Sequence, residues 1–172
     1  MGESWFLARC LRQLPDLLPD VRAVITYADP VERRAASGAL IKPGHLGVIY
    51  QALSGRYRGR SSARTLWLAG DGTVVSGRML SKLSLGERGA GHAYDRLRAL
   101  GAPARAPGEG ERSYIRRALT EGPFTRLRHP GNHVYAFPAG SPALRRRVRQ
   151  SLPDPLPHPL DLNTPPCATP AS

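Results

Sequence analysis

Glycine and proline recur along the whole chain and constrain it to short elements joined by many turns. The 172 residues include 18 glycines and 17 prolines, together about a fifth of the sequence. Glycine adopts turn conformations at little cost, and proline interrupts both helices and central strands. We therefore expect a turn-rich fold with at least one segment that has no regular structure.

The end of the chain is the segment least suited to folding. Residues 141–150 are expected to form a basic helix or coil. From Ser151 onward, seven of the 22 residues are proline. Such a segment has too little apolar content to offset the entropy of ordering it. The length suits one domain, so we expect a folded domain over residues 1–140 and a basic, then proline-rich, disordered tail over residues 141–172.

A strong positive charge favours polyanionic partners. The formal net charge is +12, and Lys42 and Lys82 are the only lysines, so arginine carries nearly all of it. Arginine suits bidentate contacts to phosphates and base edges. Nucleic acid, an anionic membrane surface and phosphorylated ligands are the partner classes that this charge favours. A GC-rich coding bias explains the arginine content equally well.

The cysteines and the apolar runs exclude several protein classes. Cys10 and Cys167 form neither a disulfide framework nor a zinc motif. No apolar run approaches the roughly 18 to 20 residues of a membrane span. The first residues carry an acid where a signal peptide carries basic residues. We expect a cytoplasmic protein with no membrane partner.

Periodicity predicts alternating helices and strands in the first part of the chain. Residues 3–14 have apolar side chains at helical spacing, with Pro15 as the stop. Residues 21–30 contain a β-branched and aromatic run typical of a buried strand. A loop is predicted over residues 31–44. A short helix follows over residues 45–53 and an extended segment from Arg56 to Arg60.

The second part reads as hairpins and helices. We predict one hairpin about Asp71-Gly72 and a C-terminal hairpin about the HPGN sequence, because both are turn signals between apolar runs. Helices are predicted over residues 90–100 and 112–120. The resulting class is α/β (α+β).

Tyr50 is the first candidate for chemistry. It lies in the middle of the short predicted helix, in PGHLGVIYQALSG. A hydroxyl in this place can donate a proton to a leaving group, or the ring can simply fill the core. Both interpretations are open on this segment alone.

Several motifs in order resemble two related families. The strand VITYAD and the helix HLGVIYQAL resemble the second half of the GNAT acyltransferase fold. The series ESWFLARCLR, ITYADP, PGHLGVIYQA, a DG hairpin and RHPGNHVYAF resembles the Mom family of GNAT-like DNA-modification proteins. The resemblance extends from about residue 3 to residue 138. It implies conversion of the exocyclic amino group of adenine to a carbamoylmethyl form, which protects phage or prophage DNA from restriction.

The resemblance implies acetyl-CoA as cofactor and double-stranded DNA as partner. Ser4, Tyr27, Gly47 and Tyr50 match the positions expected to bind the cofactor, with the first turn of the Ser4 helix facing the pyrophosphate. The target base has to leave the stack, because its amino group is paired inside the duplex.

The resemblance also implies catalytic roles for Tyr50, Asp29 and His45. Tyr50 protonates the leaving CoA thiolate. Asp29 orients the substrate amine or, with His45, ligates a divalent metal such as Fe(II). An aspartate that caps a turn before proline and a histidine at a helix start are the alternative interpretations. Two candidate ligands fall short of a metal site.

A further set of residues is expected to contact nucleic acid. The arginines would hold phosphates and the last two residues would line the substrate pocket: Arg56, Arg58, Arg60, Arg64, His133 and Tyr135.

The chain departs from the family at its beginning. A GNAT domain has several strands before the helix that here begins near Glu3, so we expect a partial GNAT-like fold, truncated at the N-terminus. Two other functions stay open: an N-acetyltransferase acting on a small amine or a protein, and an inactive basic DNA-binding remnant.

Overall fold

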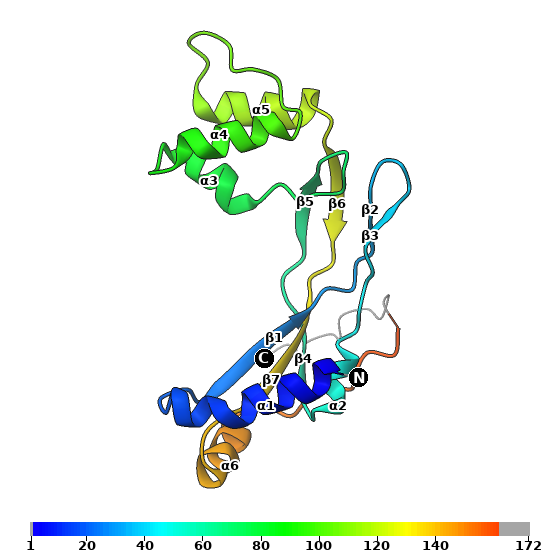
Figure 1. Ribbon diagram of the computed structural model, residues 1–172, viewed down its shortest axis with the longest axis vertical. Coiled ribbons are helices and arrows are strands. Elements are labelled where there is room, and N and C mark those ends of the chain that lie inside the picture. Colours follow the sequence, from blue (N-terminus) through cyan, green and yellow to red (C-terminus); the bar gives the residue numbers. More distant parts are fainter. Residues whose placement is uncertain (1, 162–172) are drawn as a thin grey trace. The chain divides into compact units, whose positions relative to one another are not determined.

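The computed structural model describes residues 2–161 of the chain (Figure 1). Within this range it contains six helices and seven short strands, so the mixed α/β class predicted from the sequence is confirmed. Every strand pairing among these residues is antiparallel. Where the sequence predicts one folded domain over residues 1–140, the described elements form two compact units.

Unit 1 comprises residues 2–31, 44–62 and 130–161. It is built on a three-stranded sheet in the order β1-β7-β4. Both outer strands run antiparallel to β7 and therefore parallel to each other, with α2 in the connection between them. Its elements are α1 (Gly2–Leu17), β1 (Ala23–Ala28), α2 (Val48–Ala52), β4 (Arg56–Arg60), β7 (His133–Pro138) and α6 (Pro142–Ser151).

Unit 2 comprises residues 32–43 and 63–129. Two two-stranded sheets, β2-β3 and β5-β6, accompany three helices. Leu97, Tyr114 and Ala118 are fully buried at the centre of its apolar cluster. Its elements are β2 (Arg33–Arg34), β3 (Leu40–Lys42), β5 (Arg64–Leu68), α3 (Gly77–Leu85), α4 (Ala90–Ala99), α5 (Glu111–Glu121) and β6 (Thr125–His129).

The predicted C-terminal hairpin is wrong, although both of its strands exist. β6 pairs with β5, and β7 pairs with β1 and β4, so the strands on either side of the HPGN sequence belong to different sheets. Gly131 has a φ of 97° and a Cβ there would overlap the Ser61 carbonyl. The glycine therefore permits close approach of the chain to Ser61 rather than a tight hairpin turn.

The Asp71-Gly72 turn is tight, but it joins only a fragment of a hairpin. A single bridge links Leu68 to Val74, and β5 makes its extended pairing with β6 instead. The Asp71 carboxylate accepts hydrogen bonds from the backbone and hydroxyl of Thr73, which lowers its pKa. The turn signal was correct and the pairing partner was not.

Three further expectations differ from the structure. Residues 33–42 form the β2-β3 hairpin where a loop was expected. Helix α1 continues through Pro15 to Leu17, because the proline lies near the helix end and the backbone bond from Leu18 to Leu14 still closes the last turn. Helix α3 had no counterpart among the predicted elements, although Ser76 caps its N-terminus and Gly86 ends it.

The first part of the predicted tail packs against unit 1. Residues 142–151 form helix α6, and the backbone N–H of Leu156 then donates to the Tyr57 carbonyl of β4. The Leu156 side chain joins the apolar cluster of the unit. Residues 162–172, the rest of the predicted disordered tail, lie outside the described residues.

Candidate functional site

Four of the predicted site residues lie at one end of the unit 1 sheet: Asp29, His45, Arg60 and His133. Ala28, His133 and Arg60 lie in register across the three strands. Asp29 follows β1 directly, and its backbone carbonyl accepts the N–H of His45, 2.9 Å away. Residues separated by up to 105 positions in the sequence therefore meet at this edge.

His133 is the most perturbed titratable group at this end of the sheet. Burial, with the positive charges of Arg60 and His45 nearby, lowers the pKa of His133 to about 4. The Tyr57 hydroxyl lies 2.8 Å from His133 Nδ1. The other ring nitrogen, Nε2, is buried and has no hydrogen-bond partner among the described residues. His133 is thus a neutral imidazole at pH 7 with one nitrogen still able to donate or accept.

A chain of aromatic rings connects His133 to Tyr50. Tyr57 lies 5.3 Å from Tyr135, and Tyr135 lies 5.5 Å from Tyr50, between ring centroids. His158, from the segment after α6, stacks on Tyr135 at 6.0 Å and 19°. These spacings are those of favourable aromatic pairs, so the rings hold one another in place.

Tyr135 is fixed at the centre of this chain. Its hydroxyl donates to the Leu46 carbonyl and accepts a hydrogen bond of 3.0 Å from the Gln51 amide. Burial raises its pKa, against the opposing effect of the Gln51 hydrogen bond. It is fully buried, and it therefore positions α2 against the sheet.

Gly47 is required for the approach of α2 to the sheet. It has a φ of 78°, and a Cβ there would lie 2.7 Å from the Tyr135 ring and 2.8 Å from the Tyr50 ring. Any larger residue would push both rings away. In this structure Gly47 therefore allows close packing against Tyr50 and Tyr135.

Asp29 and His45 are close, yet they form only part of a metal site. The Asp29 carboxylate accepts the Val31 N–H at 3.0 Å, which is the turn-capping arrangement considered from the sequence. Within residues 2–161, no group of three or more His, Cys, Asp and Glu side chains is placed to hold a metal ion.

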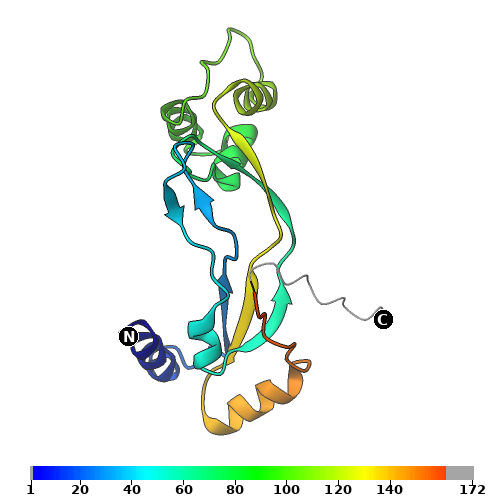
Figure 2. The same cartoon turned by 90° about the vertical axis from the view of Figure 1, so that its right-hand side faces the viewer.

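The first turn of α1 and helix α2 line a hollow. It measures about 420 Å³ and is bounded by Glu3, Ser4, Val48, Ile49 and Ala52. The two helices pack against each other, as both views of the chain show (Figures 1 and 2). Ser4 and the helix of Tyr50 thus contribute to one surface.

The residues predicted to contact nucleic acid lie in several places. Arg56 and Arg58 each donate to the Pro153 carbonyl, at 3.3 and 2.8 Å, so both guanidinium groups contact the C-terminal segment. Arg64 begins β5 in unit 2. His133 and Tyr135 are fully buried, which keeps them out of reach of a DNA phosphate.

Tyr27, expected at the cofactor, lies on the other face of the sheet. It pairs with Val134 and is 54% exposed, whereas its neighbour Ala28 is buried with His133. Successive strand residues point to opposite faces, which separates Tyr27 from Tyr50.

Tyr57 and His158 are members of the site that sequence reasoning missed. Tyr57 lies in β4, and its alternation with half-buried arginines in RYRGR was an available signal of a buried ring. His158 follows from no local pattern, because it stands in a proline-rich stretch without periodicity.

Comparison with known proteins identifies no relative. No protein-family model matches the chain, and neither a curated protein nor a solved structure is similar enough to be counted as one. The resemblance to the Mom family therefore depends on the sequence motifs alone.

Proposed function

We propose that this chain belongs to a Mom-type, GNAT-like enzyme that modifies the exocyclic amino group of adenine in double-stranded DNA to a carbamoylmethyl form. Its action would protect phage or prophage DNA from restriction. The cofactor would be acetyl-CoA, which supplies the two-carbon acyl unit when bound. The carbamoylmethyl product also requires an amine donor for its amide nitrogen and a two-electron oxidant for the bond between the adenine nitrogen and the methyl carbon, and both would be further co-reactants.

The hollow between α1 and α2 carries this proposal. Ser4 and Ile49 come from motifs 45 positions apart in the sequence, and both line it. The free N–H groups of the first turn of α1 favour an anion such as a pyrophosphate. The apolar side chains of Val48 and Ile49 suit the less polar part of a long ligand.

Tyr50 is suited to the role of proton donor. Its ring is held by Tyr135 and Phe137, at centroid distances of 5.5 and 6.3 Å. No described residue makes a hydrogen bond with its hydroxyl. A positioned hydroxyl without a competing partner can give its proton to a leaving thiolate.

The Tyr57–His133 pair is suited to a positioning role rather than to direct contact with substrate, because both side chains are buried. An imidazole with a pKa of about 4 is a weak base at pH 7. We therefore assign His133 a positioning role through Tyr57 rather than proton abstraction.

The experiment that tests the function is nucleoside mass spectrometry on host DNA after expression of the full chain. We expect a new adenosine species from the parent and from Tyr94→Phe, a matched control in α4 of unit 2. Tyr50→Phe should lower the yield by about 10²-fold or more, as expected for loss of a general acid. Equal yields from Tyr50→Phe and Tyr94→Phe would remove Tyr50 from the mechanism. Unaltered DNA together with an acetylated protein would replace the proposal with a protein N-acetyltransferase.

A further inference from the structure

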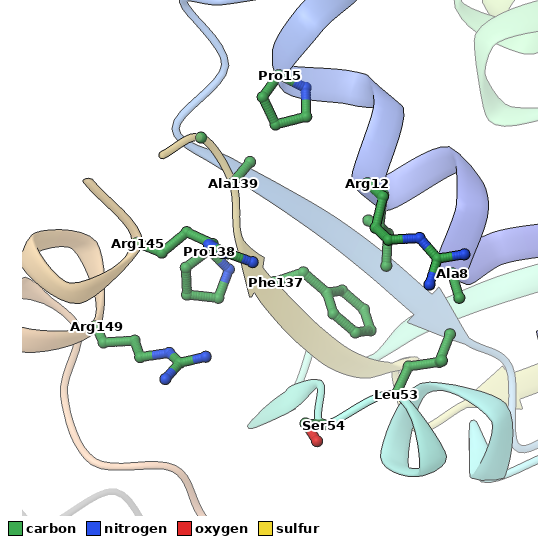
Figure 3. Close-up of a pocket in the computed structure, with 12 residues that line it drawn as sticks. Ala8, Arg12, Pro15, Leu53, Ser54, Phe137, Pro138, Ala139, Arg145 and Arg149 are labelled. Carbon is green, nitrogen blue, oxygen red and sulfur yellow. The ribbon is translucent and has the colours of Figure 1, made fainter. Parts of the chain in front are cut away.

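A second hollow in unit 1 is lined by arginines from two helices. It measures about 490 Å³ and lies between α1, the end of β7 and α6. Arg12 extends from α1, and Arg145 and Arg149 extend from α6 (Figure 3). Gly140 brings α6 close to the strand end, because a Cβ there would lie 2.5 Å from Leu144.

The three guanidinium groups have no acidic partner. Within residues 2–161, none of them makes a hydrogen bond or an ion pair. Arg145 and Arg149 are one helical turn apart, in a helix with four arginines and no acid. Like charges at this spacing destabilise a helix unless an anion lies between them. In unit 2, by contrast, Arg117 forms two hydrogen bonds to Glu109.

The same hollow holds a residue in an uncommon backbone conformation. Ser54 has a φ of 61° and is the only non-glycine residue with positive φ in the described part of the chain. This position after a helix favours glycine. The serine adds a hydroxyl donor to the lining of the hollow, which glycine would not.

We propose that this hollow binds a phosphate of a DNA backbone. Arginine pairs bidentately with phosphate oxygens, and the Ser54 hydroxyl adds one donor. Arg146 and Arg147, exposed on the same helix, extend the positive surface beyond the hollow. An extended polyanion uses such a surface more fully than a small phosphate. Arg56 and Arg58 are hydrogen-bonded to the Pro153 carbonyl. We therefore assign the phosphate contact to the arginines of α6 rather than to those of β4. The inference deepens the proposed function and rests on it for the choice of DNA as partner.

The test is fluorescence anisotropy of a labelled 20-base-pair duplex with the full chain, over a range of salt concentrations. Arg145→Gln/Arg149→Gln should weaken binding at least about tenfold. It should also reduce the steepness of the log–log salt dependence by about 2, one phosphate contact per arginine. Arg112→Gln/Arg116→Gln on α5 removes the same charge from exposed positions in unit 2 and should change affinity less than about threefold.

Equal losses from the two double variants would overturn the site, since only net charge would then matter. A second titration with pyrophosphate distinguishes a small ligand. Pyrophosphate affinity that depends on Arg145 and Arg149, with DNA affinity unchanged, also overturns the proposal. The binding assay needs no catalysis, so its outcome is separable from the proposed function. Loss of DNA affinity in the double variant, without any modified adenosine from the parent, would retain this site and reject the enzyme.

Discussion

The two units of this chain are stabilised by different kinds of side chain. The buried cluster of unit 2 is mainly aliphatic and includes Leu83, Leu97 and Leu119. The buried cluster of unit 1 is mainly aromatic, and its rings carry hydroxyl groups and lie beside the buried imidazole of His133. Aliphatic side chains bring burial and nothing else, whereas tyrosine and histidine also bring hydrogen-bonding groups.

The surfaces of the two units also differ, in how their arginines are paired and in how many large apolar side chains they expose. Arginines of unit 2 such as Arg78, Arg105 and Arg117 are paired with glutamates. In α6, by contrast, Arg145 and Arg149 line a hollow whose described lining contains no acid. Exposed large apolar side chains are found on both units, but among the described residues they are more numerous on unit 1, where Trp5 is 61% and Phe6 64% exposed. A unit that leaves cations and apolar groups uncompensated is better suited to binding than to stability. This contrast makes unit 1 the better candidate for the proposed binding sites.

The largest expected effect comes from the aliphatic core of unit 2. Leu97 is fully buried, so Leu97→Ala should lower the free energy of unfolding of that unit by about 2–5 kcal/mol through lost burial and a residual cavity. Urea denaturation followed by Trp67 fluorescence, in a Trp5→Phe background, would measure the change.

Leu160→Ala is the matched control for that variant, because Leu160 is 91% exposed. It should change stability by less than about 0.5 kcal/mol. Amide hydrogen exchange in β7 of unit 1 tests the division into two units. Leu97→Ala, which lies in unit 2, should leave the exchange rates of β7 unchanged. Accelerated exchange in β7 would contradict two separate cores.

The next largest expected effect is a loss of unit 1 stability at acidic pH. The pKa of His133 is lowered to about 4 in the fold, against about 6.5 when unfolded. The folded state therefore binds the proton less well, and its stability is complete above pH 6.5 and declines as the pH falls toward 4. The loss for unit 1 should be about 1–3 kcal/mol, allowing for partial screening by solvent. Amide exchange in β7, corrected for its intrinsic pH dependence, would report it, and His133→Asn should flatten the response.

Unit 2 should respond to acid at lower pH. The hydrogen bonds from Arg117 and from the Ala106 backbone lower the pKa of Glu109 to about 2, from about 4.5. This contribution to stability is present above pH 4.5 and is lost as the pH falls toward 2. Exchange in α5 should therefore accelerate only after exchange in β7 has done so. Simultaneous acceleration in both elements would mean that one common transition dominates.

Local signals predicted elements well and pairings poorly. Helices α1, α4 and α5 follow from apolar spacing within about a dozen residues. The HPGN sequence is equally local, yet β7 pairs with β1, which lies more than 100 residues earlier. A local turn sequence does not specify which distant strand a strand will pair with. Helix α3 was within reach of sequence reasoning, since Ser76 and Gly86 are ordinary helix boundaries.

The site was predicted in part for the same reason. The motifs supplied Asp29, His45 and Tyr50, which the structure places in one unit. The hydrogen bond between Tyr57 and His133 depends on strand register across β4 and β7, which the sequence does not reveal. Tyr135 was expected to contact the DNA substrate. It is buried instead, and its hydroxyl donates to the Leu46 carbonyl just before α2.

The smallest effect concerns the segment after α6, which the sequence predicts to be disordered. Leu156 is half-buried against the unit 1 cluster, and its N–H donates to Tyr57. Leu156→Ala should cost unit 1 about 1 kcal/mol, less than a fully buried leucine because part of the side chain already contacts water. Faster exchange in β4 would measure it, with Leu160→Ala again as the control from the same segment. Identical β4 exchange in the two variants would show that the segment adds nothing to unit 1. It would also free Arg56 and Arg58 from Pro153, and both would then return as candidates for the phosphate contacts now assigned to α6.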